Sequence, residues 1–229
     1  MTPGTICLLL SPTVSVRFLI KINSKNRTIR LIFVNNSIMK KTILASASPR
    51  RKELIASLPI QIVSVIPAES ELPYQKRLSP EENVAAISAA KAENVSERAV
   101  GIEYDLIIAA DTIVVIDDRV LGKPKDGMDA ISMLSFLSGR KHQVYTGVTI
   151  LSDDRKISFA EKTDVTFNPM SGDEILDYVK SGEPMDKAGA YGIQGKAKLF
   201  IKEIKGSYEN VIGLPVAELY RVLSVEQLI

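Results

Sequence analysis

Cysteine and histidine are nearly absent from this chain of 229 residues, which contains one of each, Cys7 and His142. A single cysteine excludes a disulfide framework within the chain and any cluster of thiolate metal ligands. We therefore expect a reducing, cytoplasmic environment. A single histidine argues against a Ser-His-Asp triad and a multi-histidine metal site. We expect His142 to be structural or solvated, in a basic turn beside Lys141.

Several common ligand-binding motifs are also missing. The chain contains no G-x-G-x-x-G fingerprint, no H-E-x-x-H motif and no nucleophile elbow. Gly195-Lys196 does not complete a Walker A loop, because Ala190 stands where the first glycine belongs and Ala197 follows the lysine. Carboxylates, lysines and arginines remain as the catalytic inventory, and metal-assisted phosphate chemistry uses these groups.

Acidic residues are missing from residues 1–38, which carry five of the 29 basic residues of the chain. The remainder has 24 basic and 27 acidic residues, a net charge of −3, so nucleic-acid binding is not expected. Met39 begins a run that resembles a natural N-terminus. We expect residues 1–38 to be a miscalled start or a disordered leader, with an organellar transit peptide as the alternative, and residues 39–229 to form one domain. No apolar run approaches the roughly 20 residues that span a bilayer, so no membrane partner is expected.

Apolar runs alternate with helical patterns along residues 39–229, and an antiparallel pair of strands follows. Ser79, Pro80 and Glu82 form a strong helix start, with an N-cap, a first-turn proline and a capping box. The pattern predicts strands at 42–47, 61–65, 106–110, 143–151, 155–167 and 199–204, helices at 49–58, 79–98, 126–137, 171–179 and 215–223, and a glycine-rich loop at 182–198. The order indicates a single α/β domain with a mixed twisted sheet.

The stretch Ser46-Ala47-Ser48-Pro49-Arg50-Arg51 connects a predicted strand to a predicted helix. Ser48 as the N-cap and Pro49 at the first helical position are ordinary helix chemistry. Two arginines at the positive end of the helix dipole are unfavourable in themselves. Together with the hydroxyls and N–H groups of a helix start, they would suit a phosphate chain. Both interpretations stay open from this stretch alone.

Three further residues are candidates for chemistry. Asp111 follows the strand 106–110, and ligands of α/β sheets collect at the carboxyl ends of strands; a plain strand-ending cap is the alternative. Lys123 lies in a Gly-Lys-Pro turn, either reaching a phosphate or simply exposed. The glycines of residues 186–195 permit close approach to a ligand. Gln194 there can donate and accept at once, which suits a base edge, or it is a surface amide.

Five segments together resemble the Maf family of nucleoside triphosphate pyrophosphatases. They are 44–51 (LASASPRR), 110–112 (ADT), 121–124 (LGKP), 186–195 (DKAGAYGIQG) and 206–215 (GSYENVIGLP), in the order and spacing of the family. The resemblance implies an elongated α/β fold with a mixed sheet and a central cleft, similar to the inosine triphosphate pyrophosphatases. It also implies hydrolysis of a nucleoside triphosphate between its α and β phosphates, which releases pyrophosphate.

The resemblance further implies roles for individual residues. Asp111 matches the proton acceptor that activates the attacking water. Glu71 falls at the acidic loop position near a divalent metal, Mg²⁺ or Mn²⁺, which Asp111 would share; Glu69 is the rival for that position. The positions linked to base selectivity are matched by Arg50, Thr112 and Gln194, and the positions that handle phosphate by Ser48, Arg51, Lys91 and Lys123.

The form Ala-Tyr-Gly-Ile-Gln-Gly at 190–195 resembles the branch of the family that acts on dTTP and UTP. If Gln194 pairs with the N3–H and the adjacent carbonyl of uracil or thymine, a base that lacks this pattern leaves buried groups unpaired. Modified pyrimidine triphosphates would fit as well. Two alternatives stay open: the same chemistry on 7-methyl-GTP or other triphosphates, and a non-catalytic regulator of cell division that binds nucleotides or nucleic acid. The resemblance also raises the expectation of a homodimer.

Overall fold

The computed structural model describes residues 16–23, 28–35, 39–69 and 72–229. The chain divides into two compact units, Met1–Met39 and Lys40–Ile229. In the first unit, strands β1 (Val16–Asn23) and β2 (Thr28–Asn35) pair antiparallel. A start of translation at Met39 stays a prediction. None of the helices in the described ranges is long and apolar enough to cross a membrane.

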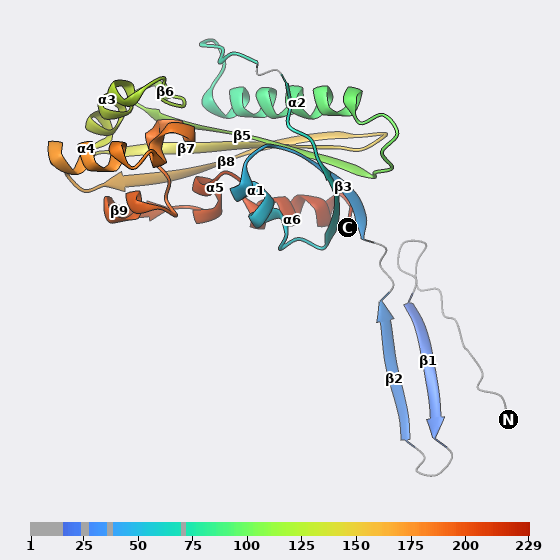
Figure 1. The fold of residues 1–229 in the computed structure, drawn as a ribbon. Coiled ribbons are helices and arrows are strands. Elements are labelled where there is room, and N and C mark those ends of the chain that lie inside the picture. The colour runs from blue at the N-terminus through green and yellow to red at the C-terminus, as the bar shows by residue number, and fades with distance from the viewer. Residues whose placement is uncertain (1–15, 24–27, 36–38, 70–71) are drawn as a thin grey trace. The chain divides into compact units, whose positions relative to one another are not determined.

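The second unit contains a mixed seven-stranded sheet, which confirms the predicted α/β class (Figure 1). Its strands are β3 (Lys40–Ala45), β4 (Ile60–Val65), β5 (Leu106–Ile116), β6 (Arg119–Leu121), β7 (Lys141–Leu151), β8 (Lys156–Phe167) and β9 (Ile201–Lys205). The spatial order is β4-β3-β5-β7-β8-β9, and β6 pairs with β5. β3 runs parallel to β4 and β5, whereas the other pairs are antiparallel.

Helices cover both faces of the sheet (Figure 1). α2 (Pro80–Arg98) and α3 (Gly127–Leu137) lie on one side, and α1 (Pro49–Ile55), α5 (Tyr208–Ile212) and α6 (Val216–Val225) lie on the other. α4 (Gly172–Lys180) packs against α3, and three short 3-10 turns follow it: η1 (Glu183–Asp186), η2 (Ala188–Ala190) and η3 (Lys196–Leu199). The capping box at Ser79 is confirmed, whereas α5 and β6, of five and three residues, were not expected.

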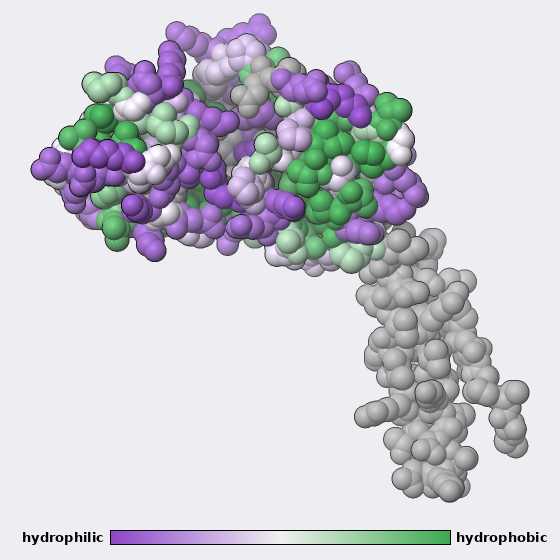
Figure 2. All heavy atoms as spheres, in the orientation of Figure 1, coloured by the Kyte–Doolittle hydropathy of each residue, from purple (hydrophilic) through white to green (hydrophobic). Residues whose placement is uncertain are grey.

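Alternation along the strands sorts the core into two layers. In β5, Ile107 and Ala109 pack with residues of α2, whereas Leu106 and Ile108 pack with residues of α1 and α6. At the edge of the sheet, β4 exposes Val63 and Val65. Figure 2 shows apolar side chains gathered at the end of this unit where β3 and α6 lie.

Asp111 does not end a strand, which corrects the sequence-based placement. β5 runs unbroken from Leu106 to Ile116, because β7 pairs with it continuously and places Gly147 opposite Asp111. The other edge of β5 is interrupted: β3 pairs with it up to Ala109, and β6 pairs with it only from Val114 onward. Residues 110–113 therefore border a gap in the sheet. The strand whose carboxyl end lies at this gap is β3, not β5.

His142 is fully buried in β7, so its placement in a basic turn was wrong, although the structural interpretation is confirmed. Its Nε2 lies 2.8 Å from the hydroxyl of Tyr191, and both rings contact Phe167 edge-on. Burial lowers the pKa of His142 from 6.5 to about 4.

Gly147 sets how closely α2 approaches the sheet. A Cβ at this position would lie 2.2 Å from the carbonyl oxygen of Val84 in α2, and both atoms belong to regular, packed elements. We expect Gly147→Ala to destabilise the protein by about 3 kcal/mol or more, because the backbone of a helix must move. Urea unfolding measures the loss. Gly172→Ala is the matched control, since a Cβ there meets nothing within 4 Å, and an equal loss in both variants would contradict this account.

The buried His142 also predicts a loss of stability in acid. Its pKa is about 4 in the folded protein and 6.5 when unfolded, so the unfolded state binds the proton more tightly. The contribution is complete above pH 6.5 and is lost progressively as the pH falls from 6.5 toward 4. We expect about 2–3 kcal/mol of this loss by pH 4.5. Urea unfolding at pH 7 and 4.5 should show a smaller loss for His142→Gln than for the wild type; equal losses would refute the assignment.

Candidate active site

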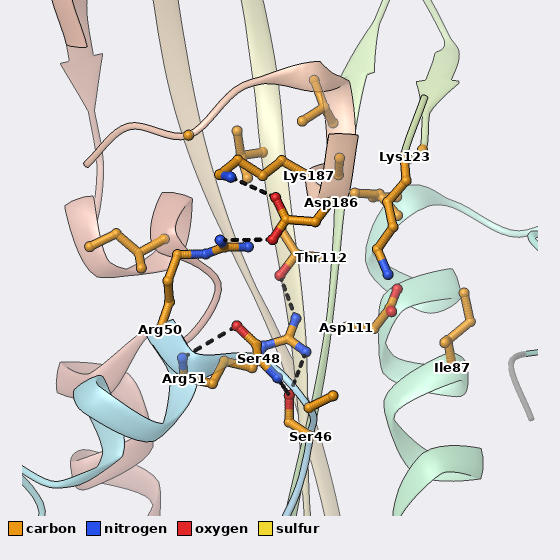
Figure 3. Close-up of a pocket in the computed structure, with 18 of the residues that line it drawn as sticks. Ser46, Ser48, Arg50, Arg51, Ile87, Asp111, Thr112, Lys123, Asp186 and Lys187 are labelled. Carbon is orange, nitrogen blue, oxygen red and sulfur yellow. Dashed lines mark hydrogen bonds and ion pairs between the residues drawn. The ribbon is translucent and has the colours of Figure 1, made fainter. Parts of the chain in front are cut away.

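A pocket of about 710 Å³ lies at the gap in the edge of β5 (Figure 3). The sequence-predicted residues that line it are Ser48, Arg50, Arg51, Lys91, Asp111, Thr112, Lys123 and Gln194. Glu71 lies outside the described residues. Glu69 does not line the pocket; its carboxylate pairs with Arg98 at the end of α2, with 2.8 Å between Oε1 and Nη2. Residues from α1, α2, β5, the turn after β6 and the glycine-rich loop therefore meet in one place.

Asp111 faces the α2 side of the pocket and contacts Lys91. The Lys91 Nζ donates to Oδ1 of Asp111 over 2.7 Å, and the two side chains are only 10% and 14% exposed. A carboxylate and an ammonium so far from bulk solvent stabilise one another by direct pairing. Lys123 extends from the turn after β6 toward Asp111 (Figure 3). Asp111 is thus held in a fixed position at the pocket wall, with cations beside it.

Arg51 faces the opposite side and binds three protein oxygens. Its guanidinium donates to the Gly213 carbonyl (2.8 Å), the Ser46 hydroxyl (3.3 Å) and the Thr112 hydroxyl (3.0 Å). The Thr112 hydroxyl also lies 2.9 Å from that of Thr146, which donates to the Asn210 carbonyl. Arg51 therefore connects α1 to β5 and to the segment around α5. This network explains an arginine at a helix start without any phosphate.

Arg50 is directed to a different partner, the carboxylate of Asp186 in the glycine-rich loop. The Arg50 Nη1 lies 3.3 Å from Oδ2 of Asp186, and the Lys187 Nζ lies 2.6 Å from Oδ1 (Figure 3). Burial alone would raise the pKa of Asp186, but the hydrogen bond and charge of Lys187, with the charge of Arg50, outweigh it and lower that pKa. Asp186 is therefore a negative group clamped between two cations at the pocket.

Two glycines of the loop accommodate side chains of the protein itself. A Cβ at Gly192 would lie 2.5 Å from the Lys187 side chain, and one at Gly195 would lie 1.8 Å from the Glu183 carboxylate. The protein's own side chains therefore require glycine at both positions, whereas the sequence suggests the close approach of a ligand as the reason. Gln194 lies between them, exposed, in a turn that lines the pocket.

Sequence reasoning placed Ser46, Asp186 and Lys187 within candidate segments but gave none of them a role of its own at the site. Ser46 accepts from both Arg51 and the backbone N–H of Ser48, which fixes the turn between β3 and α1. The adjacent Asp186 and Lys187 were visible as an opposite-charge pair heading the loop. Arg50, the partner of Asp186, stands 136 positions earlier, however, and no local signal connects the two.

The oxygen donors in the pocket fit a divalent cation that also binds phosphate. Mg²⁺ is usually held by one or two carboxylates and by substrate phosphates rather than by a complete protein cage. Among the described residues, no three His, Cys, Asp or Glu gather as a metal cluster. Lys91 bonds one oxygen of Asp111, Oδ1, while Asp186 is bonded through both of its oxygens. Of the two carboxylates that line the pocket in the described part of the chain, Asp111 is therefore the one with an oxygen to offer.

Comparison with known proteins matches residues 41–226 to the family described as "Maf-like protein". A relative from Carboxydothermus hydrogenoformans, named dTTP/UTP pyrophosphatase, is 50% identical over 185 residues, which cover 80% of this chain and 97% of the relative. A protein of the same name from Bacillus velezensis is 50% identical over 184 residues, or 80% and 95% of the two chains. Another from Bacillus cytotoxicus is 46% identical over 187 residues, or 81% and 95%.

Proposed function

Since the chain belongs to the family of Maf-like proteins, we propose that it is a pyrophosphatase that hydrolyses dTTP and UTP to the nucleoside monophosphate and pyrophosphate. Modified pyrimidine triphosphates are further substrates in this proposal. One observation carries it on the structural side: a single pocket brings together a held carboxylate, five cationic side chains and the amide of Gln194. The names of the relatives support the choice of substrate.

The proposed proton acceptor is Asp111. It takes a proton from a water molecule as that water attacks the α phosphorus, and pyrophosphate leaves. A positioned general base contributes on the order of 10²–10⁴ in rate. The ion pair with Lys91 supports this role, because it holds the carboxylate in one orientation within a largely buried wall of the pocket.

Phosphate binding is assigned to Ser48, Arg51, Lys91 and Lys123. A triphosphate brings several negative charges, and a hydrogen bond to a charged group stabilises by roughly 1.5–3 kcal/mol. Lys123 fits this role best among them, because it is exposed, extends into the pocket and has no hydrogen bond or ion pair within the described part of the chain. Arg51 acts from a fixed position, because protein oxygens already orient its guanidinium.

We propose Mg²⁺ or Mn²⁺ as the cofactor, held by Asp111, by Glu71 and by phosphate oxygens. When bound, the cation neutralises phosphate charge and polarises the bond to be cleaved. The available oxygen of Asp111 supports this assignment. Glu71 lies outside the described residues. Glu69 is the weaker choice because Arg98 already engages it.

Base selectivity is assigned to Arg50, Thr112 and Gln194. Gln194 would read the N3–H and a neighbouring carbonyl of uracil or thymine. Thr112 would act through Arg51, to which its hydroxyl is bonded.

The proposal also covers the location and partners of the protein. It includes a cytoplasmic location, a homodimer and the absence of nucleic-acid partners. The exposed Val63 and Val65 on the edge strand β4 are compatible with a dimer.

The role of Asp111 predicts that Asp111→Asn lowers kcat for UTP by about 10²-fold or more, because an amide cannot accept the proton. Pyrophosphate release with Mg²⁺ measures this loss. Circular dichroism should show an intact fold, and Asp153→Asn, in the exposed turn between β7 and β8, should retain full activity. A folded Asp111→Asn protein with normal turnover would overturn the mechanism.

The role of Gln194 predicts that Gln194→Ala reduces the preference for UTP over CTP by about tenfold while kcat for UTP changes little. The measurement is kcat/KM on a panel of dTTP, UTP, CTP, GTP and 7-methyl-GTP. Gln61→Ala, exposed on β4, should leave the preference unchanged. If wild-type protein prefers 7-methyl-GTP, the alternative substrate is correct; if it hydrolyses none, the regulator becomes the better account.

A further inference from the structure

The turn that carries Gln194 is anchored on two side chains that do not line the pocket, Tyr178 of α4 and Glu183 of η1. The Gly192 N–H donates to the Tyr178 hydroxyl over 3.2 Å. That hydroxyl donates to Oε1 of Glu183 over 3.0 Å, and the Lys196 N–H donates to Oε2 of Glu183 over 3.0 Å. Backbone groups on both sides of Gln194 are therefore bonded to one connected pair of side chains.

This pair is itself fixed. Tyr178 is only 3% exposed, and its ring meets that of Phe200 edge-on at 5.7 Å between centroids. The Glu183 carboxylate fills the position that a side chain at residue 195 would occupy, so only glycine fits there. The backbone carbonyl of Glu183 accepts a hydrogen bond from the Lys187 Nζ over 2.6 Å. The turn therefore has little freedom to shift as a unit.

We propose that Tyr178 and Glu183 are positioning residues that set base selectivity by holding the amide of Gln194 in the orientation that reads a pyrimidine. The proposal rests on the proposed function. Hydrogen bonds weaken steeply when their angle departs from linearity, so an amide that must donate and accept at once needs a fixed backbone beneath it. The groups assigned to phosphate come from α1, α2 and the turn after β6, so releasing the turn should affect base reading and leave turnover intact.

The test uses two conservative variants. Tyr178→Phe removes the acceptor for the Gly192 N–H, and Glu183→Gln replaces a carboxylate that has two acceptor oxygens with an amide that has one. In both, we expect the ratio of kcat/KM for UTP to that for CTP to fall about tenfold, through a higher KM for UTP at nearly constant kcat. In the double variant Tyr178→Phe/Gln194→Ala the ratio should match that of Gln194→Ala alone, because the anchor acts through that amide.

The controls separate positioning from general damage. Tyr220→Phe and Glu203→Gln make the same chemical changes at exposed positions and should alter neither ratio nor KM. Thermal unfolding below the assay temperature would explain lost activity but not a changed ratio, so Tm is measured in parallel. If Gln194→Ala changes the ratio while both anchor variants retain the wild-type value, the positioning role is refuted and the proposed function stands. Wild-type protein that releases no pyrophosphate refutes the proposed function instead.

Discussion

The interrupted edge of β5 is the constraint on which the arrangement of the site depends. β3 leaves this edge at Ala109, and β6 resumes pairing at Val114, while β7 pairs with the opposite edge along residues 107–115. The segment between is therefore open on one side and hydrogen-bonded on the other. An opening bordered by a continuous strand gives side chains a rigid base, which a loop of the same length would not provide.

Strand alternation then explains why two consecutive residues serve different sides of one pocket. Asp111 and Thr112 point to opposite faces of the sheet, the first toward Lys91 of α2 and the second toward Arg51 of α1. A pocket on one face could use only every second residue of the strand. The gap exposes both faces at once, and Gly147 on the neighbouring strand admits α2 close enough for its lysine to reach Asp111.

Local signals in the sequence were sufficient for most elements, and most of the residues proposed from the sequence line one pocket. The N-cap and capping box around Ser79 predicted the start of α2, because a cap depends on residues within one turn. The continuation of β5 past Asp111 was not predictable in this way. Two polar residues usually end a buried strand, and here pairing with β7, a partner far along the chain, overrides that preference. Likewise, the need for glycine at position 195 comes from the Glu183 carboxylate, which only the fold brings beside it.

The two adjacent arginines differ in how firmly each is held by the protein. Arg51 donates three hydrogen bonds to protein oxygens, and bonds of a charged donor contribute roughly 1.5–3 kcal/mol each. Arg50 has a partly exposed ion pair with Asp186, and exposed pairs contribute only about 0–1 kcal/mol. The pair of Arg50 with Asp186 is therefore the easier of the two to rearrange, whereas displacing Arg51 would break its bonds to β5 and to the segment around α5. In the proposed function, Arg50 can therefore turn toward the base, while Arg51 binds phosphate from a fixed position that also keeps the pocket in shape.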